Sequence, residues 1–465
     1  MSTIGQQHPK YRELMEGWEL PQTLMGGTRA LRARGNQYLP RWPRETIGQH
    51  ELRVKTSTLY NAFKRTVRVL SAKPFSDPVQ VVKMPVELQV IENDVDRQGQ
   101  TLTQFCRSAL TDQLSYGLAH WLVDNPSFPP DLNRAQQQQL NVHPYFCRVD
   151  PTTLTYWRYV KGITGEQVLE EIQITTCETD DDGVEWEVVD QWTRDTIAQY
   201  KRKKAQGKNE EQWTLTAEAP NPIGIVPLMT AYADATKKGT MEGTSPLEDL
   251  AELNLKHYQS QSDQDLCLHY ARVPFLHFAG FDENDVNKTI AVDNAFVSRD
   301  PSAKISWVEP TGKALEQGQA DLDALESRMD VMGADLMVQK PGNPTATAKS
   351  IDTAEKVSDL QAMAISLEDT IEKSFVVAGL WVGQVVDPDA VDVQLNTNFG
   401  LSLMDAKEID FLLKARIAGE ISRELFYAEI QRRGLFEEFD TKEELKRVAV
   451  ENNLDKPVLP TGNAP

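Results

Sequence analysis

The spacing of apolar positions predicts long helices in three parts of the chain. Apolar residues at 102, 105, 106, 109, 110, 114, 118 and 121 follow helical spacing, which predicts one helix with a wide buried stripe over 100–122. Positions 315, 322, 325, 329, 332 and 336 are separated by steps of seven, three and four, which is typical of the seam between paired helices. We therefore expect a long helix over 313–337, and another over 350–384, where no proline interrupts the chain.

A further long helix is expected over 244–273. Ser245 is a suitable N-cap, Pro246 suits the first helical position and Glu248 completes a capping box, while the next proline is Pro274. The second half of this helix, 259–265, is polar on every side, so it has no core of its own to lie on. Two interpretations stay open: this half stands between neighbours, or it faces water.

Strand-like patterns fill the region 143–235, where we expect an antiparallel sheet. The turn Asp181-Asp182-Gly183 has the composition of a hairpin connection. Three runs rich in β-branched and aromatic residues are expected to be strands: 154–160, 171–177 and 186–192. The turn lies between the last two of them.

A smaller β module is expected over 274–312, between two of the long helices. Its expected core residues are Phe275, His277, Phe296, Ile305 and Trp307. A module of this size at the end of two helices buries little by itself. We therefore expect neighbouring copies of the chain to complete its sheet and to bury Phe275, Phe296 and Trp307.

The segments that follow are a loop and a helical tail. Pro341, Gly342 and Pro344 predict a loop over 338–349, in which Lys340 and Lys349 are the charged residues. Three short helices are expected over 401–465, the last of them opened by a capping box at Thr441.

The charge of the chain is strongly acidic and unevenly distributed. The 465 residues hold 49 Lys and Arg against 69 Asp and Glu, a net charge of −20, which argues against a protein that coats nucleic acid with its whole surface. The first 72 residues carry the opposite sign, with twelve Lys and Arg against five Glu. This basic segment is either a solvated, irregular arm or an arm that docks on an acidic partner or on packed nucleic acid. Its most prominent cations are Arg29, Arg32, Arg34, Arg41 and Arg44.

The sequence lacks the familiar signatures of catalysis and of metal binding. It contains no GxxxxGK[ST], GxGxxG, GxSxG or HExxH motif, and its acidic runs at 180–183 and 282–285 do not fit a calcium loop. The four cysteines are too far apart for CxxC pairs, and Cys106 falls on an apolar stripe, where we expect an inert thiol. We expect no enzyme activity, no cofactor and no metal.

No membrane association is expected either. The most apolar run, 375–386, has twelve residues, whereas a span needs about 20. The N-terminal residues lack the apolar core of a signal peptide.

Taken in order, the segments resemble the compact portal-like family of tailed-bacteriophage portal proteins. No single motif is distinctive, but the resemblance runs along nearly the whole chain. The matching stretches are 100–126 (QTLTQFCRSAL through YGLAHWLVDNP), 143–158, 222–227 with 245–260, 345–355, 360–364 and 421–424.

The resemblance implies an α+β portal fold with named parts. Residues 1–243 would form the wing, with a further wing strand in 385–400. The segments 244–273 and 313–337 would be the stem helices, and 274–312 the clip between them. The remaining parts would be a tunnel loop at 338–349, a long helix at 350–384 and a helical crown at 401–465.

The resemblance also implies a function. Portal proteins form a ring, generally of twelve copies, at one capsid vertex, where they serve as the head–tail connector. Double-stranded DNA passes through the channel, without sequence specificity, during packaging and ejection. The implied partners are the major capsid protein and scaffold, the terminase large subunit and the tail adaptor, and the implied location is the virion, with the host cytoplasm during assembly.

Two groups of residues would then face the channel. An acidic lining repels phosphate, so DNA slides and does not stick; the acidic stem residues are Glu316, Asp321, Asp323, Glu326 and Asp330. In the tunnel loop, the residues expected to face DNA are Lys340, Asn343, Thr345 and Lys349. We expect replacement of both lysines by alanine to preserve ring assembly and to alter the packaging or retention of DNA.

Two other classes of function remain as alternatives. The first is another virion structural protein, such as an adaptor or a minor head protein, although the β module at 274–312 favours the portal. The second is an enzyme of unknown family, which a pocket of perturbed carboxylates would favour.

Overall fold

The computed structural model describes most of the chain. The described residues are 3–126, 142–162, 164–204, 212–271, 275–281, 300–308, 312–337, 358–397, 414 and 416. The chain divides into two compact units, Met1–Thr397 and Asn398–Pro465. The expected crown, 401–465, falls almost entirely outside the described residues, so the helices and strands that follow belong to the first unit.

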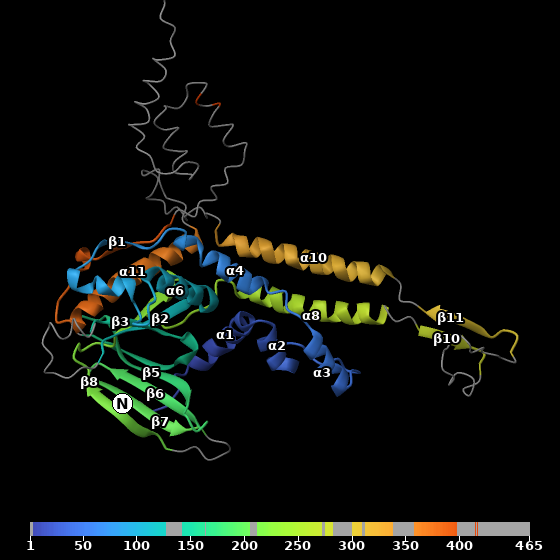
Figure 1. Ribbon diagram of the computed structural model, residues 1–465, viewed down its shortest axis with the longest axis horizontal. Helices are drawn as coiled ribbons and strands as arrows, with labels where there is room; N and C mark the ends of the chain where they lie inside the picture. The colour runs from blue at the N-terminus through green and yellow to red at the C-terminus, as the bar shows by residue number, and fades with distance from the viewer. Residues whose placement is uncertain are drawn as a thin grey trace, which may run out of the picture. The chain divides into compact units, whose positions relative to one another are not determined.

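Helices and antiparallel strands are mixed along this unit, which confirms the α+β class (Figure 1). The helices are α1 Tyr11–Gly26, α2 Thr28–Arg34, α3 Ile47–Thr56, α4 Ala62–Leu70, α5 Val90–Asn93, α6 Leu102–Tyr116, α8 Glu248–Ala271, α10 Gly312–Asp335 and α11 Asp359–Trp381. The strands are β1 Gln80–Lys83, β2 Leu118–Asp124, β3 Tyr145–Val149, β4 Leu154–Lys161, β5 Gln167–Thr179, β6 Glu185–Thr193, β7 Thr196–Lys203, β8 Thr214–Pro220, β9 Leu228–Tyr232, β10 Phe275–Ala279, β11 Lys304–Val308 and β12 Asp392–Gln394.

The N-terminal segment is folded, so the expectation of an irregular arm was wrong. Helices α1 to α4 bury Trp18, Leu24, Leu31 and Phe63. The indole Nε1 of Trp18 donates hydrogen bonds to the carbonyl oxygens of Tyr116 (2.9 Å) and Gly243 (3.0 Å), which attaches α1 to the rest of the unit. Most charged residues of this segment lie at the surface, although Arg53 is buried, and some large apolar residues such as Ile47 and Leu52 are exposed.

The helix expected over 100–122 is a helix followed by a strand. A capping box at Thr101 begins α6, and Gly117 ends it in the left-handed conformation, with φ 82°. The chain then enters β2, whose first six residues are all buried. A strand covered on both sides is apolar at successive positions, so Leu118 and Trp121 also satisfied helical spacing. The turn at 124–126 accordingly ends a strand and not a helix.

Two sheets share one core. Strands β3, β2 and β9 form an antiparallel sheet in that order, and β4 to β8 form a five-stranded antiparallel meander. The antiparallel strands expected for 143–235 are confirmed, but they belong to two sheets and not to one. Side chains of both sheets meet in one buried cluster, to which Leu122, Val149, Trp157 and Trp192 belong.

Helix α11 packs on the three-stranded sheet. Phe375 of α11 packs against Phe146 of β3 with the rings tilted by 59° and their centroids 5.4 Å apart, and Trp121 donates a 2.8 Å hydrogen bond to the hydroxyl of Ser374. Helix α11 begins at Asp359, because Ser358 and Gln361 form a capping box; the prediction of a helix from residue 350 was wrong at this end. The strand expected within 385–400 is β12, which pairs with β1.

The buried His120 should make stability fall in acid. Burial lowers its pKa to about 3, and its Nδ1 lies 2.9 Å from the hydroxyl of Thr230. Below pH 6.5 the unfolded chain takes up a proton that the folded chain excludes, so stability is lost as the pH falls. At pH 5 this group should cost about 2 kcal/mol relative to pH 8. Urea unfolding at several pH values should show a shallower acid dependence for His120→Asn, and an unchanged slope would contradict the assignment.

Candidate functional site

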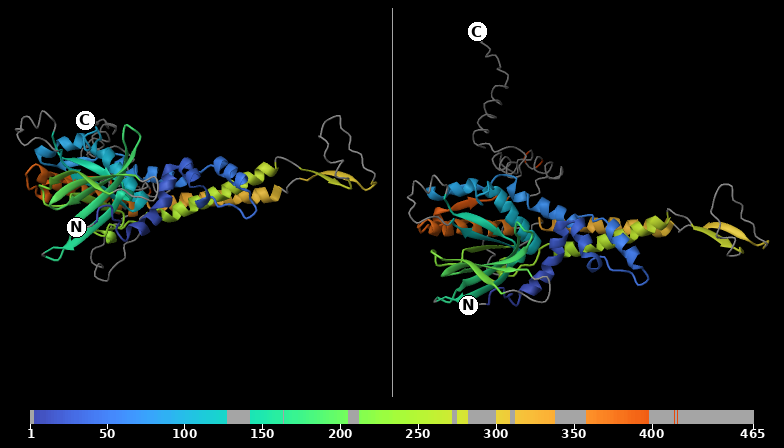
Figure 2. Two further views of the ribbon diagram at one scale, coloured as in Figure 1. Left: turned by 90° about the horizontal axis from the view of Figure 1, so that it is seen from below. Right: turned by 60° about the horizontal axis from the view of Figure 1, so that its bottom comes forward.

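Two long helices stand side by side and lead to a hairpin. Figures 1 and 2 show α8 and α10 adjacent in each view, with β10 and β11 beyond their ends. The seam predicted for α10 is confirmed, because four of its apolar residues are buried: Leu322, Leu325, Met329 and Leu336. The paired helices therefore have an apolar contact of their own before any second copy is considered.

The polar half of α8 packs within the same chain. Ser262 and Gln264 are buried; the hydroxyl of Ser57 donates to that of Ser262 (2.8 Å), and Gln264 donates to the carbonyl of Leu315 in α10 (2.9 Å). Gln259 donates to the carbonyl of Tyr38 (2.9 Å). Of the two interpretations of 259–265, the one in which this half stands between neighbours is confirmed within the chain, because other segments of the same chain contact it through polar groups.

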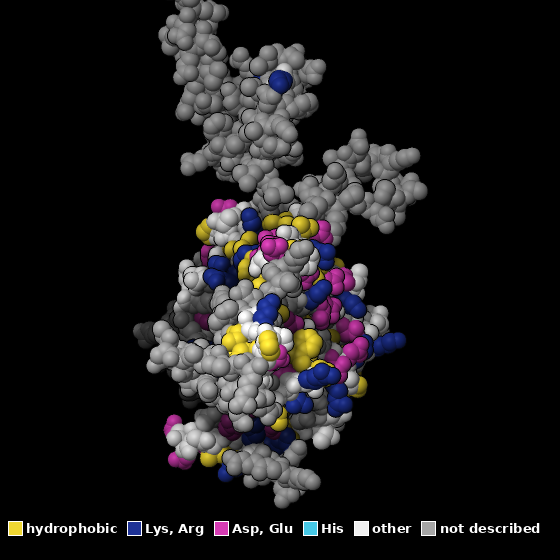
Figure 3. Space-filling model, turned by 90° about the vertical axis from the view of Figure 1, so that its right-hand side faces the viewer, with side chains coloured by type: hydrophobic (Ala, Val, Ile, Leu, Met, Phe, Trp, Pro, Cys, Tyr) yellow, Lys and Arg dark blue, Asp and Glu magenta, His cyan; other side chains and the backbone are white. Residues whose placement is uncertain are grey.

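The acidic residues predicted for the stem lie on α10. Glu316, Asp321, Asp323 and Asp330 are exposed, as predicted for a charged outer surface. Glu326 instead faces α8, where its Oε1 lies 3.2 Å from Nε2 of the buried His257. Asp330 forms an ion pair with Arg65 of α4. On the face of the molecule in Figure 3, Asp and Glu side chains are interspersed with Lys and Arg.

The expected clip contains an antiparallel pair of strands. β10 and β11 pair from Phe275 opposite Val308 to Ala279 opposite Lys304. Contrary to the prediction, His277 and Ile305 are exposed in the single chain, and Ile305 is 40% exposed. The side chains of Phe275 and Trp307, and the whole of Phe296, lie outside the described residues, so their predicted burial stays a prediction.

The predicted tunnel-loop residues also lie outside the described part of the chain. Residues 338–357 separate the end of α10 from the N-cap of α11. The roles predicted for Lys340, Asn343, Thr345 and Lys349 therefore stay predictions.

The five predicted arginines of the N-terminal segment are dispersed and not gathered. Arg32 donates to the carbonyl of Ser57 (3.0 Å from Nε), and Arg34 pairs with Glu19 at 2.7 Å. Arg29 and Arg41 are exposed, and Arg44 lines a cavity of about 770 Å³ between α3 and α8. The segment thus presents no single surface made of these five residues.

A buried ion pair holds the middle of this segment. Arg53 contacts both carboxylate oxygens of Glu45, at 2.8 and 2.9 Å, and also donates to the carbonyl of Pro40 (2.7 Å). The two side chains are only 5% and 8% exposed. The hydrogen bond from Arg53 holds the pKa of Glu45 below its ordinary value.

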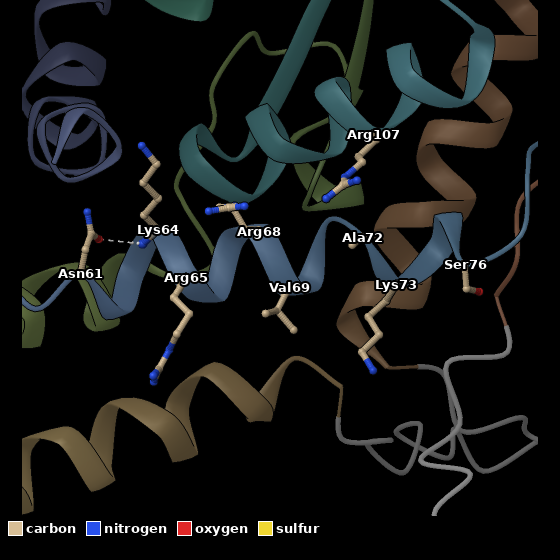
Figure 4. Close-up of a pocket in the computed structure, with 9 residues that line it drawn as sticks. All are labelled: Asn61, Lys64, Arg65, Arg68, Val69, Ala72, Lys73, Ser76 and Arg107. Carbon is tan, nitrogen blue, oxygen red and sulfur yellow. Dashed lines mark hydrogen bonds between the residues drawn. The ribbon is translucent and has the colours of Figure 1, made fainter.

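The cations that do converge were not singled out in the sequence. A groove of about 630 Å³ is lined by α4, the following turn and α6, and Figure 4 shows the basic side chains that enter it. They are Lys64, Arg65, Arg68, Lys73 and Arg107. The sequence signal was the close spacing of Lys64, Arg65 and Arg68 on one helix; the contribution of Arg107 depends on the fold.

Two features of the described residues bear on metal binding and on thiol chemistry. Among them, no group of three or more His, Cys, Asp or Glu is placed to hold a metal ion. Burial raises the pKa of Cys106 far above its ordinary value, as expected for an inert thiol. Within the described part of the chain, no helix is both long enough and apolar enough to cross a membrane.

Comparisons with known proteins give a partial family match and distant structural likenesses. A family described as "Domain of unknown function (DUF4055)" matches residues 246–382, the stretch from α8 to α11. No curated protein matches the chain.

Three solved structures show a distant likeness to the chain at low identity. One is described as the virion of a native gene transfer agent particle (11% identity, TM-score 0.42, 88% of this chain and 99% of that chain). Another is the neck of the native particle with C12 symmetry (12%, 0.40, 86% and 98%), and a third is the neck of the empty particle with C6 symmetry (12%, 0.41, 87% and 98%). Likeness at this level does not identify what the chain does.

Proposed function

We propose that the chain is a virion structural protein and, more specifically, the portal protein of a tailed phage or phage-like particle. The observation that carries the proposal is the order of α8, the β10–β11 hairpin and α10, in which two paired helices lead to a small β module. This is the helix–strand–helix order that the resemblance predicts for a stem and a clip. The chain would form a ring, generally of twelve copies, at one capsid vertex.

The β10–β11 hairpin is an argument for assembly of the chain into an oligomer. An isolated two-stranded hairpin is at best marginally stable in water. Among the described residues, no third strand pairs with the outer edge of β10 or β11, and Ile305 leaves apolar surface in contact with water. Neighbouring hairpins in a ring would supply the missing strands and cover this surface.

The acidic exterior of α10 supports a conduit. Exposed carboxylates along a channel repel the phosphates of DNA, so the part of the channel that α10 lines would not hold DNA. The ring would catalyse no reaction of its own; the terminase would hydrolyse ATP and dock on the clip, and the tail adaptor would replace it. Capsid protein and scaffold would contact the wing.

Electron microscopy of the purified full-length chain tests this proposal. Negatively stained particles should include top views of a ring with a central hole, and class averages should give its symmetry. A protein that stays monomeric at all concentrations and salt conditions, with no ring in any view, would overturn the proposal.

A single substitution tests the role of the hairpin. We expect Ile305→Asp to leave the fold of the monomer intact, because Ile305 is already 40% exposed, and to weaken ring assembly. Assembly would bury only the exposed 40% of the Ile305 side chain, which is worth about 1 kcal/mol, but a carboxylate placed there adds a desolvation cost. Together these effects should raise the protein concentration needed for assembly by about tenfold or more. Analytical ultracentrifugation measures this concentration.

Leu215→Asp on β8 is the matched control, because Leu215 is 47% exposed and lies far from the hairpin in the sequence. Equal assembly of Ile305→Asp and the wild type would show that this side of the hairpin is not at an interface.

A further inference from the structure

Three of the cations in the groove beside α4 have no partner within the described chain. Arg65 pairs with Asp330, and Lys64 donates to the carbonyl of Met25 (2.8 Å). For Arg68, Lys73 and Arg107, no hydrogen bond or ion pair links the side chain to any described residue. Other cations of the N-terminal segment, such as Arg34 and Arg53, do pair with carboxylates of the same chain. The groove therefore keeps positive charge that the chain itself does not neutralise.

The arrangement of these cations suits phosphate. Figure 4 shows Arg68 on α4 and Arg107 on α6 pointing toward one another across the groove, and the described residues that line the cavity include no carboxylate. Two guanidinium groups that face each other repel unless an anion lies between them. The planar guanidinium binds phosphate oxygens in pairs, which makes Arg well suited to this role.

The spacing of the cations suits a polymer of phosphates. Lys64 and Lys73 are nine residues apart along α4 and the turn after it, roughly 13 Å at the helical rise. Duplex DNA carries one charge per about 1.7 Å of its axis, so roughly four base pairs run past this row of cations. Val69, which is 50% exposed, lies between the cations and leaves the groove open to a large ligand.

We propose that Arg68, Lys73 and Arg107 form a contact site for the phosphate backbone of double-stranded DNA. This inference rests on the proposed function, because it assigns a DNA-contacting surface to the same conduit. It locates the contact on α4 and α6, and not on the five arginines predicted from the sequence. The contact reads no base sequence, because a row of cations on the backbone binds all sequences alike.

Fluorescence anisotropy of a short labelled duplex tests the site. The triple variant Arg68→Ala, Lys73→Ala and Arg107→Ala should bind at least about tenfold more weakly than wild type at low salt, on two unrelated sequences alike. The slope of log affinity against log salt concentration should become less steep by about 2.7, because each lost phosphate contact reduces its magnitude by about 0.9. These side chains are exposed, so thermal unfolding should match that of the wild type.

The matched control is the variant Arg29→Ala, Arg41→Ala and Arg44→Ala, which removes the same charge from exposed positions outside the groove. An equal loss of affinity in this control, or wild-type affinity in the groove variant, would overturn the inference. Binding of inorganic phosphate alone, without binding of the duplex, would also overturn it.

Electron microscopy of the same samples separates the two proposals. Rings with unchanged DNA affinity in the groove variant overturn the phosphate site and leave the conduit standing. Loss of rings without loss of DNA affinity would show that the groove receives a second copy of the chain. Absence of rings in the wild type is a failure of the proposed function itself.

Discussion

Replacement of Gly117 by alanine should destabilise the fold by about 3 kcal/mol or more. Gly117 has φ 82°, and a Cβ atom there would lie 2.2 Å from the carbonyl oxygen and 2.3 Å from the nitrogen of Thr244. Both are backbone atoms, so no side-chain rotation relieves the clash. Thr244 immediately precedes Ser245, whose hydroxyl donates to the carbonyl of Leu114 (2.7 Å) and accepts from the amide of Leu247 (3.1 Å). A shift of Thr244 would therefore disturb the junction of α6, β2 and α8.

Urea unfolding followed by tryptophan fluorescence measures this loss. Gly165 is the matched control, because it also has a positive φ, 93°, but a Cβ atom there would meet no other atom within 4 Å. Gly165→Ala should cost about 1 kcal/mol, the strain of the backbone conformation alone. If both variants lose the same stability, the close approach to Thr244 is not what requires glycine.

Replacement of Arg53 by alanine should cost about 3–5 kcal/mol, because it leaves the carboxylate of Glu45 buried without its partner. Arg53 supplies two hydrogen bonds to Glu45 and one to the carbonyl of Pro40. Because Arg53 lowers the pKa of Glu45 in the folded state, the stabilisation is present above the ordinary pKa of 4.5 and is lost as the pH falls through the folded value. Arg53→Ala should therefore be less acid-sensitive than wild type below pH 5, as well as less stable at pH 7.

Arg34→Ala is the control for this experiment. Arg34 and Glu19 form an ion pair of similar length, but their side chains are 41% and 31% exposed, so the loss should stay within about 1 kcal/mol. The double variant Glu45→Gln with Arg53→Met should recover part of the stability, because it removes both charges. Equal losses for Arg53→Ala and Arg34→Ala would show that burial of the pair is not decisive.

The fold could be predicted where the spacing of apolar residues fits only one kind of element, a helix or a strand. The seam of α10 follows its pattern closely, because its apolar residues share one buried side. The predicted strands at 154–160, 171–177 and 186–192 lie within β4, β5 and β6, although burial does not alternate regularly along these strands. The junction of α6 and β2 could not be read in this way, because a strand buried on both faces has no alternation. Gly117 was the available signal for the boundary, and Ser358 with Gln361 was the signal for the start of α11.

The candidate site was less accessible to sequence reasoning. The charge count identified the basic N-terminal segment, but the arginines selected from it do not form one site. Arg32 contacts a backbone carbonyl, and Arg34 forms an ion pair with Glu19. The groove joins Arg68 of α4 to Arg107 of α6, residues whose proximity depends on tertiary packing. The polar side of α8 was equally hidden, because its partners, such as Ser57 and the carbonyl of Leu315, are distant in the sequence.

The polar contacts between α8 and α10 have a mechanical consequence. A slide of one helix past the other by one turn, about 5.4 Å, would separate Gln264 from the carbonyl of Leu315 and His257 from Glu326. Each buried polar group left without a partner costs about 1–3 kcal/mol, and the apolar seam would lose its register as well. The two helices therefore resist sliding along their axes and move as one rigid unit. A force applied to the hairpin would be transmitted along this rigid pair of helices to Asn254 of α8. Asn254 accepts a hydrogen bond from the amide of Phe63 (2.9 Å), so the force would also reach α4.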